Sequence, residues 1–147
     1  MAAIRRAEAI WSGALTTGSG TVSAVSSGAF SGLPVTWAAR TETSEGRTSP
    51  EELVAAAHAS CFAMALSGAL NRAGTPPERL DVSAEVTFDK LDAGWRVVSS
   101  ALTVRGRVPG MSAADFEAAA DATKDGCPIS VALAGNVALS VVATLEG

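Results

Sequence analysis

The chain has 147 residues, of which 48% are hydrophobic and 18% are charged, and its net charge is -4. This length suits a single domain with a buried core, so residues 1–147 are expected to form one domain. Lysines and arginines are scattered singly through an acidic chain, which argues against nucleic-acid binding. The first residues hold two arginines but no apolar run, so no signal peptide and a cytoplasmic location are expected.

The first forty residues alternate short β-prone runs with turns rich in glycine and serine. Residues 21–25 form one such run, and residues 35–39 form another that ends at Arg40. Glycine, serine and proline clusters separate these runs. We therefore predict a strand meander from about Ile4 to Arg40, with Arg40 at the end of a strand and a polar loop after it.

The segment 48–72 is predicted to be one long helix. Ser49 suits the N-cap and Pro50 the first helical position, and Glu52 completes a capping box. The body consists mainly of Ala, Leu, Met and Phe and has almost no charge before Arg72. Because a helix that is apolar on nearly every face needs cover on nearly every face, we expect this helix to be buried.

The same helix raises the alternative of a membrane span. Leu53 to Leu70 is about 18 residues without a formal charge, close to the lower limit for crossing a bilayer. However, the stretch contains a histidine and two serines, and the sequence around it is amphipathic. We therefore expect the core helix of a soluble protein and no membrane association.

Period-two alternation begins at Asp81 and predicts a half-buried strand. The segment 92–94 is a hairpin turn, and the return strand runs to about Val108. The apolar phase of this return strand flips near residues 98–100, which predicts a β-bulge there.

Two helices and a strand complete the chain. Ser112 is predicted to cap a helix that ends near Lys124, and Pro128 to open a short helix. Residues 137–145 alternate again and predict the last strand. The order of elements predicts an α+β fold, with helices packed against mostly antiparallel sheet.

The chain has two cysteines, Cys61 and Cys127, and one histidine, His58. Without a secretory signal a disulfide scaffold is not expected, and this set lacks the spacing of a metal site. Two interpretations stay open, which are inert core thiols and a redox pair. Cys61 lies in the middle of the apolar helix, where a cysteine is usually an unreactive small hydrophobe.

Cys127 precedes Pro128 and is therefore predicted at a helix N-cap, where free N–H groups favour a thiolate. The alternative is a cap residue without chemistry. His58 lies three residues before Cys61, on the same helical face. It could form a Cys–His dyad, or it could be a neutral histidine with its ring hydrogen-bonded elsewhere.

Two charged residues could act on a thiol. Arg40 keeps its positive charge in proteins and can hold a neighbouring thiol as thiolate, although a solvated arginine at a strand end is the alternative. Glu51 lies in the first turn of the long helix, where a carboxylate also complements the helix dipole without any further role.

These residues lie in a sequence that resembles the OsmC/Ohr family of thiol peroxidases, and its OsmC branch more closely than its Ohr branch. The one departure is Ser49, where the family often has Asn, and both residues cap helices. The matching motifs extend over nearly the whole chain and comprise residues 11–13, 18–23, 40, 49–53, 57–62, 89–94, 108–110 and 126–128.

The resemblance implies an intertwined homodimer in which long central helices lie between sheets, with two active sites at the subunit interface. It implies that Cys61 is the peroxidatic thiol and Cys127 the resolving thiol, and that Arg40 and Glu51 activate Cys61. The implied activity is reduction of organic hydroperoxides and hydrogen peroxide through a Cys61 sulfenic acid and a Cys61–Cys127 disulfide. The implied reductant is an external dithiol of the lipoyl type, and no bound cofactor or metal is expected.

Helix geometry adds an independent expectation. Glu51 and Cys61 are ten residues apart, which places them about 15 Å apart along the axis of an unbroken helix. A site that uses both residues would need Glu51 from a second chain. The alternative function is a non-enzymatic redox-sensing or ligand-binding stress protein, also a dimer.

Overall fold

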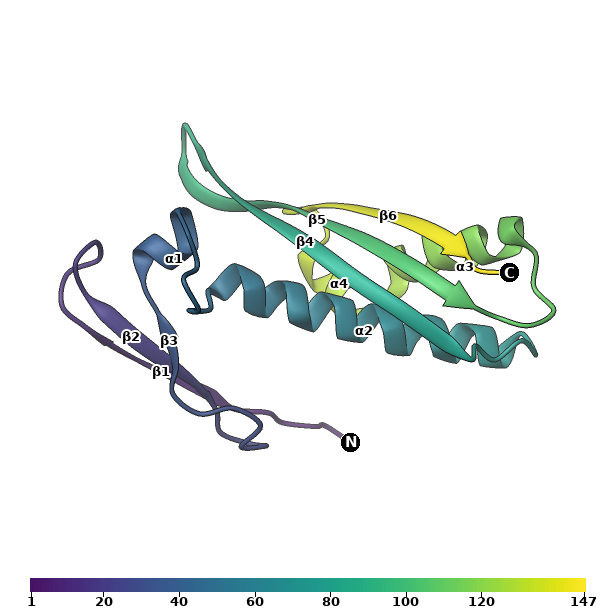
Figure 1. Cartoon of the computed structure of the whole chain (residues 1–147), viewed down its shortest axis with the longest axis horizontal. Helices are drawn as coiled ribbons and strands as arrows, with labels where there is room; N and C mark the ends of the chain where they lie inside the picture. The colour runs from purple at the N-terminus through teal and green to yellow at the C-terminus, as the bar shows by residue number, and fades with distance from the viewer. The chain divides into compact units, whose positions relative to one another are not determined.

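The structure is a computed structural model that describes residues 1–147. The chain forms two compact units, residues 1–53 and residues 54–147. The boundary between the units falls inside the long helix α2 (Pro50–Arg72; Figure 1), and each unit is described by itself. The expectation of one domain over residues 1–147 stays a prediction.

The first unit is a three-stranded antiparallel sheet followed by a short helix. Its strands β1 (Ala7–Ser12), β2 (Ser19–Ala24) and β3 (Leu33–Val35) pair in that order, which confirms the predicted meander. The next element is the helix α1 (Trp37–Thr41) and not a strand.

The prediction that Arg40 ends a strand is therefore wrong, because the chain turns helical after Thr36. The Thr36 hydroxyl accepts a hydrogen bond from the backbone N–H of Ala39 at 3.1 Å and so caps α1. The β-prone composition of residues 35–39 is overridden by this local cap.

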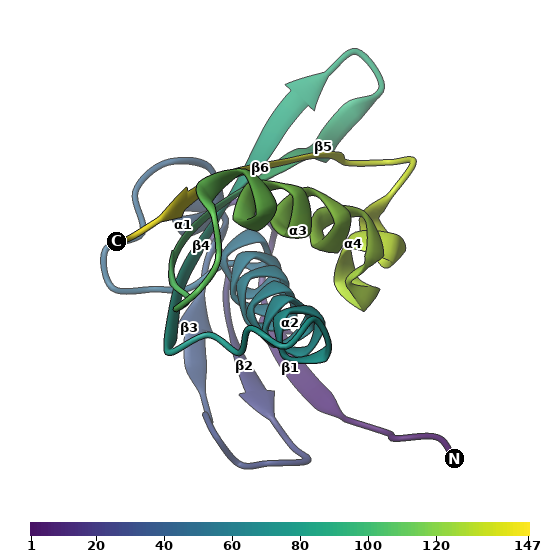
Figure 2. The same cartoon turned by 90° about the vertical axis from the view of Figure 1, so that its right-hand side faces the viewer.

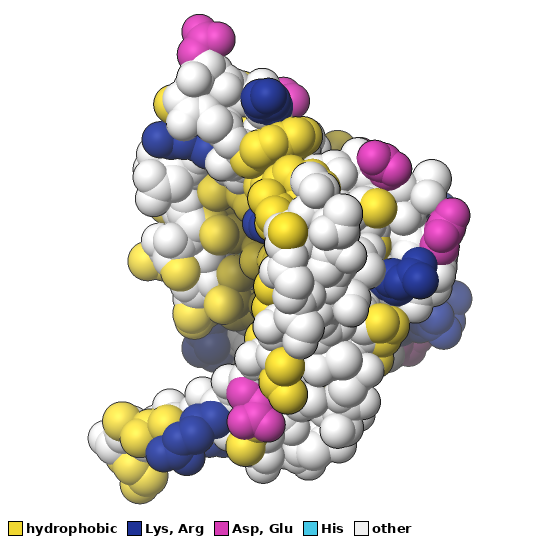
Figure 3. Space-filling view, turned by 90° about the vertical axis from the view of Figure 1, so that its left-hand side faces the viewer, with side chains coloured by type: hydrophobic (Ala, Val, Ile, Leu, Met, Phe, Trp, Pro, Cys, Tyr) yellow, Lys and Arg dark blue, Asp and Glu magenta, His cyan; other side chains and the backbone are white.

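Strand β1 is exposed along its whole length. Ile10 and Trp11 on this strand are 67% and 43% exposed. Figure 3 shows hydrophobic side chains open on the molecular surface. An exposed edge strand with large hydrophobic side chains is typical of a surface that another chain covers.

Helix α2 has the predicted limits and the predicted cap. The Ser49 hydroxyl accepts a hydrogen bond from the Glu52 N–H at 3.1 Å, and the Glu52 carboxylate accepts one from the Thr48 hydroxyl at 2.7 Å. By length and composition alone α2 could span a membrane, but the core helices of soluble proteins often have the same length and composition.

The chain buries only one face of α2. Just 22% of its most apolar 18-residue window is buried, so the chain by itself does not provide the burial on nearly every face that the composition of the helix predicts. Met64 is 71% exposed. In the second unit the fully buried positions of α2 recur every four residues, at His58, Phe62, Leu66 and Leu70.

The second unit contains the sheet β4-β5-β6, formed by β4 (Arg79–Leu91), β5 (Gly94–Arg107) and β6 (Ala138–Leu145). Strands β4 and β5 form the predicted hairpin. Thr87 pairs with Ser99 and Phe88 with Val97, which leaves Val98 as the extra residue and confirms the predicted bulge.

Strand β6 pairs with β5 in the parallel sense, whereas the other pairings are antiparallel. The helices α3 (Ala113–Gly126) and α4 (Pro128–Leu133) provide the crossover that a parallel pairing needs. As predicted, Ser112 caps α3 by accepting a hydrogen bond from the Asp115 N–H at 3.1 Å.

Helices α2, α3 and α4 lie on one side of the β4-β5-β6 sheet (Figure 2). The core between sheet and helices has no room at Gly106 of β5, because a Cβ there would overlap the ring of Phe116 on α3. The buried core residues come from α2, β5 and the residue after it, α3 and the start of α4, and are Phe62, Leu66, Leu70, Leu102, Val104, Val108, Phe116, Ala120 and Cys127.

Candidate active site

Both cysteines lie in the second unit, and both are free thiols. Cys61 is half-buried on α2 and packs against the core, and Cys127 at the start of α4 is 1% exposed. Cys61 packs against the buried cluster that contains Cys127, and Cys127 is near enough to raise the pKa of Cys61. The fold therefore brings together two thiols that are far apart in the sequence.

The surroundings of Cys61 in the second unit disfavour its thiolate. Burial is the largest influence and raises the pKa of Cys61 above its ordinary value. A hydrogen bond from the backbone N–H of Ile129 lowers this pKa, and the neighbouring Cys127 raises it. No positive charge is among these influences.

Cys127 occupies the predicted N-cap position of α4. Its sulfur accepts a hydrogen bond from the Ser130 N–H at 3.4 Å, and its S–H donates to the Ser130 hydroxyl at 3.2 Å. Cys127 therefore has direct polar partners, unlike a cysteine that only fills space.

His58 is fully buried, and both of its ring nitrogens have serine partners. Nδ1 lies 2.6 Å from the Ser100 hydroxyl, and Nε2 lies 2.8 Å from the Ser130 hydroxyl. The Cys61–His58 dyad is therefore not formed, and His58 is a histidine whose ring is hydrogen-bonded elsewhere. Burial lowers its pKa below the ordinary value, so it is neutral at neutral pH.

Sequence reasoning missed Ser100 and Ser130. A signal for Ser100 was available, since the bulge at Val98 shifts the phase of β5 and turns Ser100 toward the core. Ser130 lies at the third position of α4, where its N–H reaches the capping residue Cys127. Neither serine has a sequence pattern that links it to His58.

The first unit contains the predicted pair of Arg40 and Glu51. The Arg40 Nε donates to both Glu51 carboxylate oxygens, at 2.9 and 3.0 Å, and its Nη2 lies 2.8 Å from Oε1. Glu51 is 7% exposed. The guanidinium also lies over the ring of Trp37, 5.7 Å from its centre. These paired hydrogen bonds between guanidinium and carboxylate fix the orientation of the Arg40 guanidinium group.

Two clusters thus hold the predicted site residues, one with Arg40 and Glu51 and the other with Cys61 and Cys127. Helix α2 is unbroken between Glu51 and Cys61, which places them about 15 Å apart along its axis.

A groove between α2 and α3 reaches Cys127 and has a volume of about 310 Å³. Small side chains make up most of its wall, and one cation lies at its border. The lining residues are Ala65, Ala69, Arg72, Ala119, Ala122, Thr123, Gly126 and Cys127.

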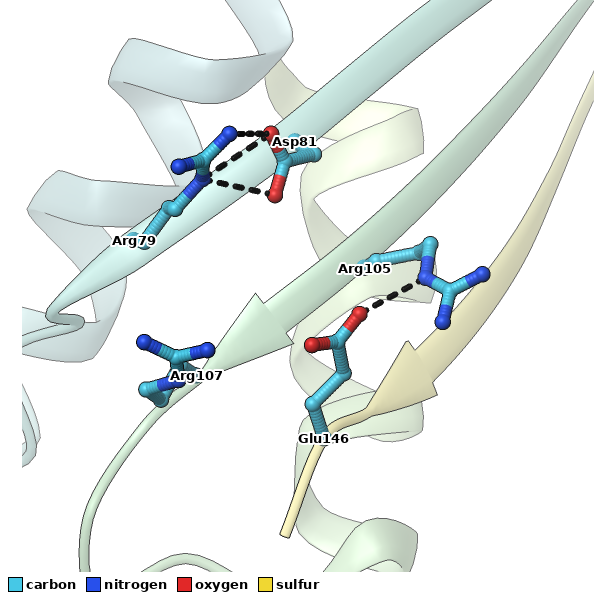
Figure 4. A pocket seen from close by; sticks show the side chains of 5 residues that line it. All are labelled: Arg79, Asp81, Arg105, Arg107 and Glu146. Atoms are coloured by element: carbon cyan, nitrogen blue, oxygen red, sulfur yellow. Dashed lines mark hydrogen bonds and ion pairs between the residues drawn. The ribbon is translucent and has the colours of Figure 1, made fainter.

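A second hollow, of about 240 Å³, is lined by charged side chains of the β4-β5-β6 sheet (Figure 4). Arg79 pairs with Asp81, and Arg105 pairs with Glu146, both at 2.7 Å. Arg107 completes the lining. Because it contains no thiol and its charges largely neutralise one another, we do not assign it to the redox chemistry. No group of three or more His, Cys, Asp or Glu side chains is arranged to hold a metal ion.

The family model of OsmC-like proteins matches residues 43–142, a stretch that contains both cysteines and Glu51. The chain belongs to the OsmC-like protein family. It is 41% identical to the peroxiredoxin OsmC of Escherichia coli (strain K12) over 92% of the chain and 93% of the relative.

A more distant relative is the organic hydroperoxide resistance protein OhrA of Bacillus subtilis (strain 168). It is 33% identical over 63% of the chain and 64% of the relative. The fold matches the crystal structure of an organic hydroperoxide resistance protein from Elizabethkingia anophelis with a TM-score of 0.75, at 20% identity over 99% and 100% of the two chains. Sequence and fold therefore agree on the family.

Proposed function

We propose that the protein is a cysteine-based peroxidase that reduces organic hydroperoxides and hydrogen peroxide. The observation that carries this proposal is that two free thiols pack in one core, Cys61 half-buried and Cys127 hydrogen-bonded to Ser130. The relatives named peroxiredoxin OsmC and organic hydroperoxide resistance protein support the same activity.

In the oxidation step the Cys61 thiolate attacks the distal oxygen of the peroxide. The S–O bond forms as the O–O bond breaks, and the leaving oxygen takes a proton to become water or an alcohol. Cys61 is oxidised to a sulfenic acid by two electrons. An arginine beside the reacting atoms stabilises both the thiolate and the charge that develops on the leaving oxygen.

In the resolution step Cys127 condenses with the sulfenic acid to a Cys61–Cys127 disulfide and releases water. An external dithiol of the lipoyl type then reduces the disulfide by thiol exchange. The groove that Cys127 lines is a candidate place for such a donor to bind, and of the two cysteines the half-buried Cys61 is the more accessible.

We assign Arg40 and Glu51 to the site of a second subunit. Within α2, Glu51 and Cys61 are held about 15 Å apart along the axis, so the Glu51-bound guanidinium is better suited to the Cys61 of a partner chain. A homodimer is also supported by the largely uncovered apolar helix α2 and by the exposed strand β1. The dimer is soluble and cytoplasmic, with α2 as its central helix.

Peroxide turnover with a dithiol donor tests this function. Cys61→Ser is expected to abolish turnover, because it removes the nucleophile. In wild-type protein, one equivalent of peroxide is expected to consume two thiols per chain and to give an intrachain Cys61–Cys127 disulfide by mass spectrometry. Full activity of Cys61→Ser would overturn the mechanism.

The same measurements separate the alternatives. Loss of thiols without turnover would indicate a redox sensor. Unchanged thiols after peroxide would indicate a ligand-binding protein in which both cysteines are inert.

A further inference from the structure

A continuous chain of hydrogen bonds connects Cys127 to the interior of the second unit. The Cys127 S–H donates to the Ser130 hydroxyl at 3.2 Å, and this hydroxyl lies 2.8 Å from His58 Nε2. His58 Nδ1 lies 2.6 Å from the Ser100 hydroxyl. Cys127 is 1% exposed and the other three residues are fully buried, so the chain is closed to bulk water.

The direction of each hydrogen bond follows from the one before it. Because Ser130 accepts from Cys127, its own O–H is left to donate to His58 Nε2. A neutral imidazole that accepts at Nε2 has its proton on Nδ1, which then donates to Ser100. Ser100 therefore holds the ring in the tautomer whose free lone pair points toward Ser130.

We propose that Ser130 and His58 form a proton relay that deprotonates the resolving thiol Cys127. Two protons shift along the chain, one from Cys127 to Ser130 and one from Ser130 to His58. Afterwards the imidazolium donates from both nitrogens, and Ser130 donates to the Cys127 thiolate. All three donors still have acceptors, so the shift needs no movement of heavy atoms.

This inference rests on the proposed peroxidase function, because the thiolate is needed to resolve the Cys61 sulfenic acid. The Cys127 sulfur attacks the Cys61 sulfur, the S–S bond forms, and the S–O bond breaks. The hydroxide that leaves takes up one proton to become water, which balances the proton that Cys127 gave to the relay. Cys127 is oxidised and Cys61 is reduced within the same step, so no external oxidant is required.

The surroundings of His58 suit a transient proton acceptor. The groups in hydrogen-bond contact with His58 are neutral, Ser100 on β5 and Ser130 on α4, and the Cys127 thiol lies one hydrogen bond farther along the chain. Burial alone lowers the pKa of His58, and no carboxylate holds it protonated. The ring is therefore neutral before the reaction, and because burial disfavours the imidazolium, the proton is returned within one turnover.

Ser130 and His58 have different roles in the relay. Ser130 touches the reacting sulfur, whereas His58 acts through Ser130 and is a positioning and proton-storing residue. His58→Gln keeps a side chain that can hydrogen-bond to both serines but cannot accept a proton. Ser130→Ala interrupts the relay with the loss of a single oxygen and provides a second variant if His58→Gln folds poorly.

The test follows resolution by itself, in single turnover. Reduced protein is mixed with one equivalent of peroxide between pH 6 and pH 9, and samples are quenched with a thiol-alkylating reagent and a sulfenic-acid trap. Mass spectrometry then measures the sulfenic acid at Cys61 and the Cys61–Cys127 disulfide over time. Thr75→Val is the matched control, because its part-buried hydroxyl donates to the Leu70 carbonyl and has no part in the relay.

For both relay variants we expect disulfide formation near neutral pH to slow by about 10²-fold, the lower range for general base catalysis. The deficit is expected to shrink as the pH rises toward ~8.5, where an ordinary thiol ionises without help. The control is expected to resolve at the wild-type rate. In a parallel sample with excess peroxide, more Cys61 sulfinic acid should accumulate in the relay variants, since a slow resolution leaves time for a second peroxide to oxidise the sulfenic acid.

Wild-type resolution rates in both relay variants at every pH would overturn the relay. A deficit of the same size at every pH would also overturn it, because a purely structural defect does not depend on thiol ionisation. Absence of a Cys61–Cys127 disulfide in wild-type protein would instead refute the peroxidase mechanism itself, and the relay with it.

Discussion

At the scale of single residues, no positive charge is among the influences that set the pKa of Cys61. Burial and the neighbouring Cys127 raise the pKa of Cys61, so the thiol form prevails near neutral pH. The Arg40 guanidinium, fixed by two carboxylate oxygens of Glu51, is the cation that we propose to reverse this preference.

Arg40→Lys tests whether activity requires the paired hydrogen bonds from Arg40 to Glu51 in addition to the positive charge. Lysine keeps the positive charge but cannot bind a carboxylate in two places, so we expect kcat/KM for peroxide to fall about 10- to 100-fold. Steady-state turnover with a dithiol donor measures this. Arg47→Lys is the control, because Arg47 makes only an exposed ion pair with Glu45 at 3.6 Å. Equal losses in both variants would contradict the role of Arg40.

His58 gives the protein a predictable response to acid. Because burial lowers its pKa below 6.5, the folded state binds this proton less readily than the unfolded state. The free energy of unfolding is then highest above pH 6.5 and falls as the pH drops below that value. The slope contributed by one such proton is at most about 1.4 kcal/mol per pH unit.

We therefore expect stability to fall less steeply below pH 6.5 in His58→Gln than in wild-type protein. Urea unfolding at a series of pH values measures the two slopes, and the carboxylates that also titrate in this range cancel in the comparison. Parallel slopes would show that His58 does not contribute to acid sensitivity.

At the scale of secondary structure, caps and turns made most elements after residue 48 predictable. Ser49, Ser112 and Cys127 all cap the helices that follow them, as their positions predicted. The bulge was also visible in the sequence, because it reverses the apolar phase of β5. Only α1 was missed, since five residues are too few for a helical period to compete with β-prone composition.

Gly106→Ala tests the closest approach of β5 and α3. The new methyl group would overlap the Phe116 ring in a filled core, so we expect the free energy of unfolding to fall by about 1–3 kcal/mol. Denaturant unfolding provides the measurement. Gly126→Ala is the control and is expected to have little effect, because nothing lies near its Cβ position. Unchanged stability of Gly106→Ala would mean that the sheet and α3 can separate at low cost.

At the scale of the whole molecule, the proposed homodimer links assembly to catalysis. If the Arg40–Glu51 pair of one chain serves the Cys61 of the other, two inactive variants complement each other. A mixed dimer of Glu51→Ala and Cys61→Ser chains has one complete site, whereas it has none if each chain supplies its own pair.

After unfolding and refolding an equal mixture of these variants, we expect roughly a quarter of the wild-type activity, because half the dimers are mixed and each has one of two sites. Peroxidase activity of the mixture is compared with each variant refolded alone. No recovery, in a sample whose mixed dimers are verified by native mass spectrometry, would contradict a shared site.

The sequence by itself determined the local features of this protein. Capping residues, period-two alternation and the apolar run of α2 are properties of neighbouring residues, and they predicted most element limits and the α+β class. The resemblance named the family and the four candidate residues, of which the structure brings Arg40 to Glu51 and Cys61 to Cys127.

Only the tertiary structure decided the parallel pairing of β6 and the partners of His58. Both features depend on contacts between residues that are far apart in the chain. In the case of His58, the partners are Ser100 and Ser130, one at each ring nitrogen. A periodic pattern reports which face of an element is apolar, but it cannot report which polar group another element places there. The link from Cys127 to His58 follows from that placement alone.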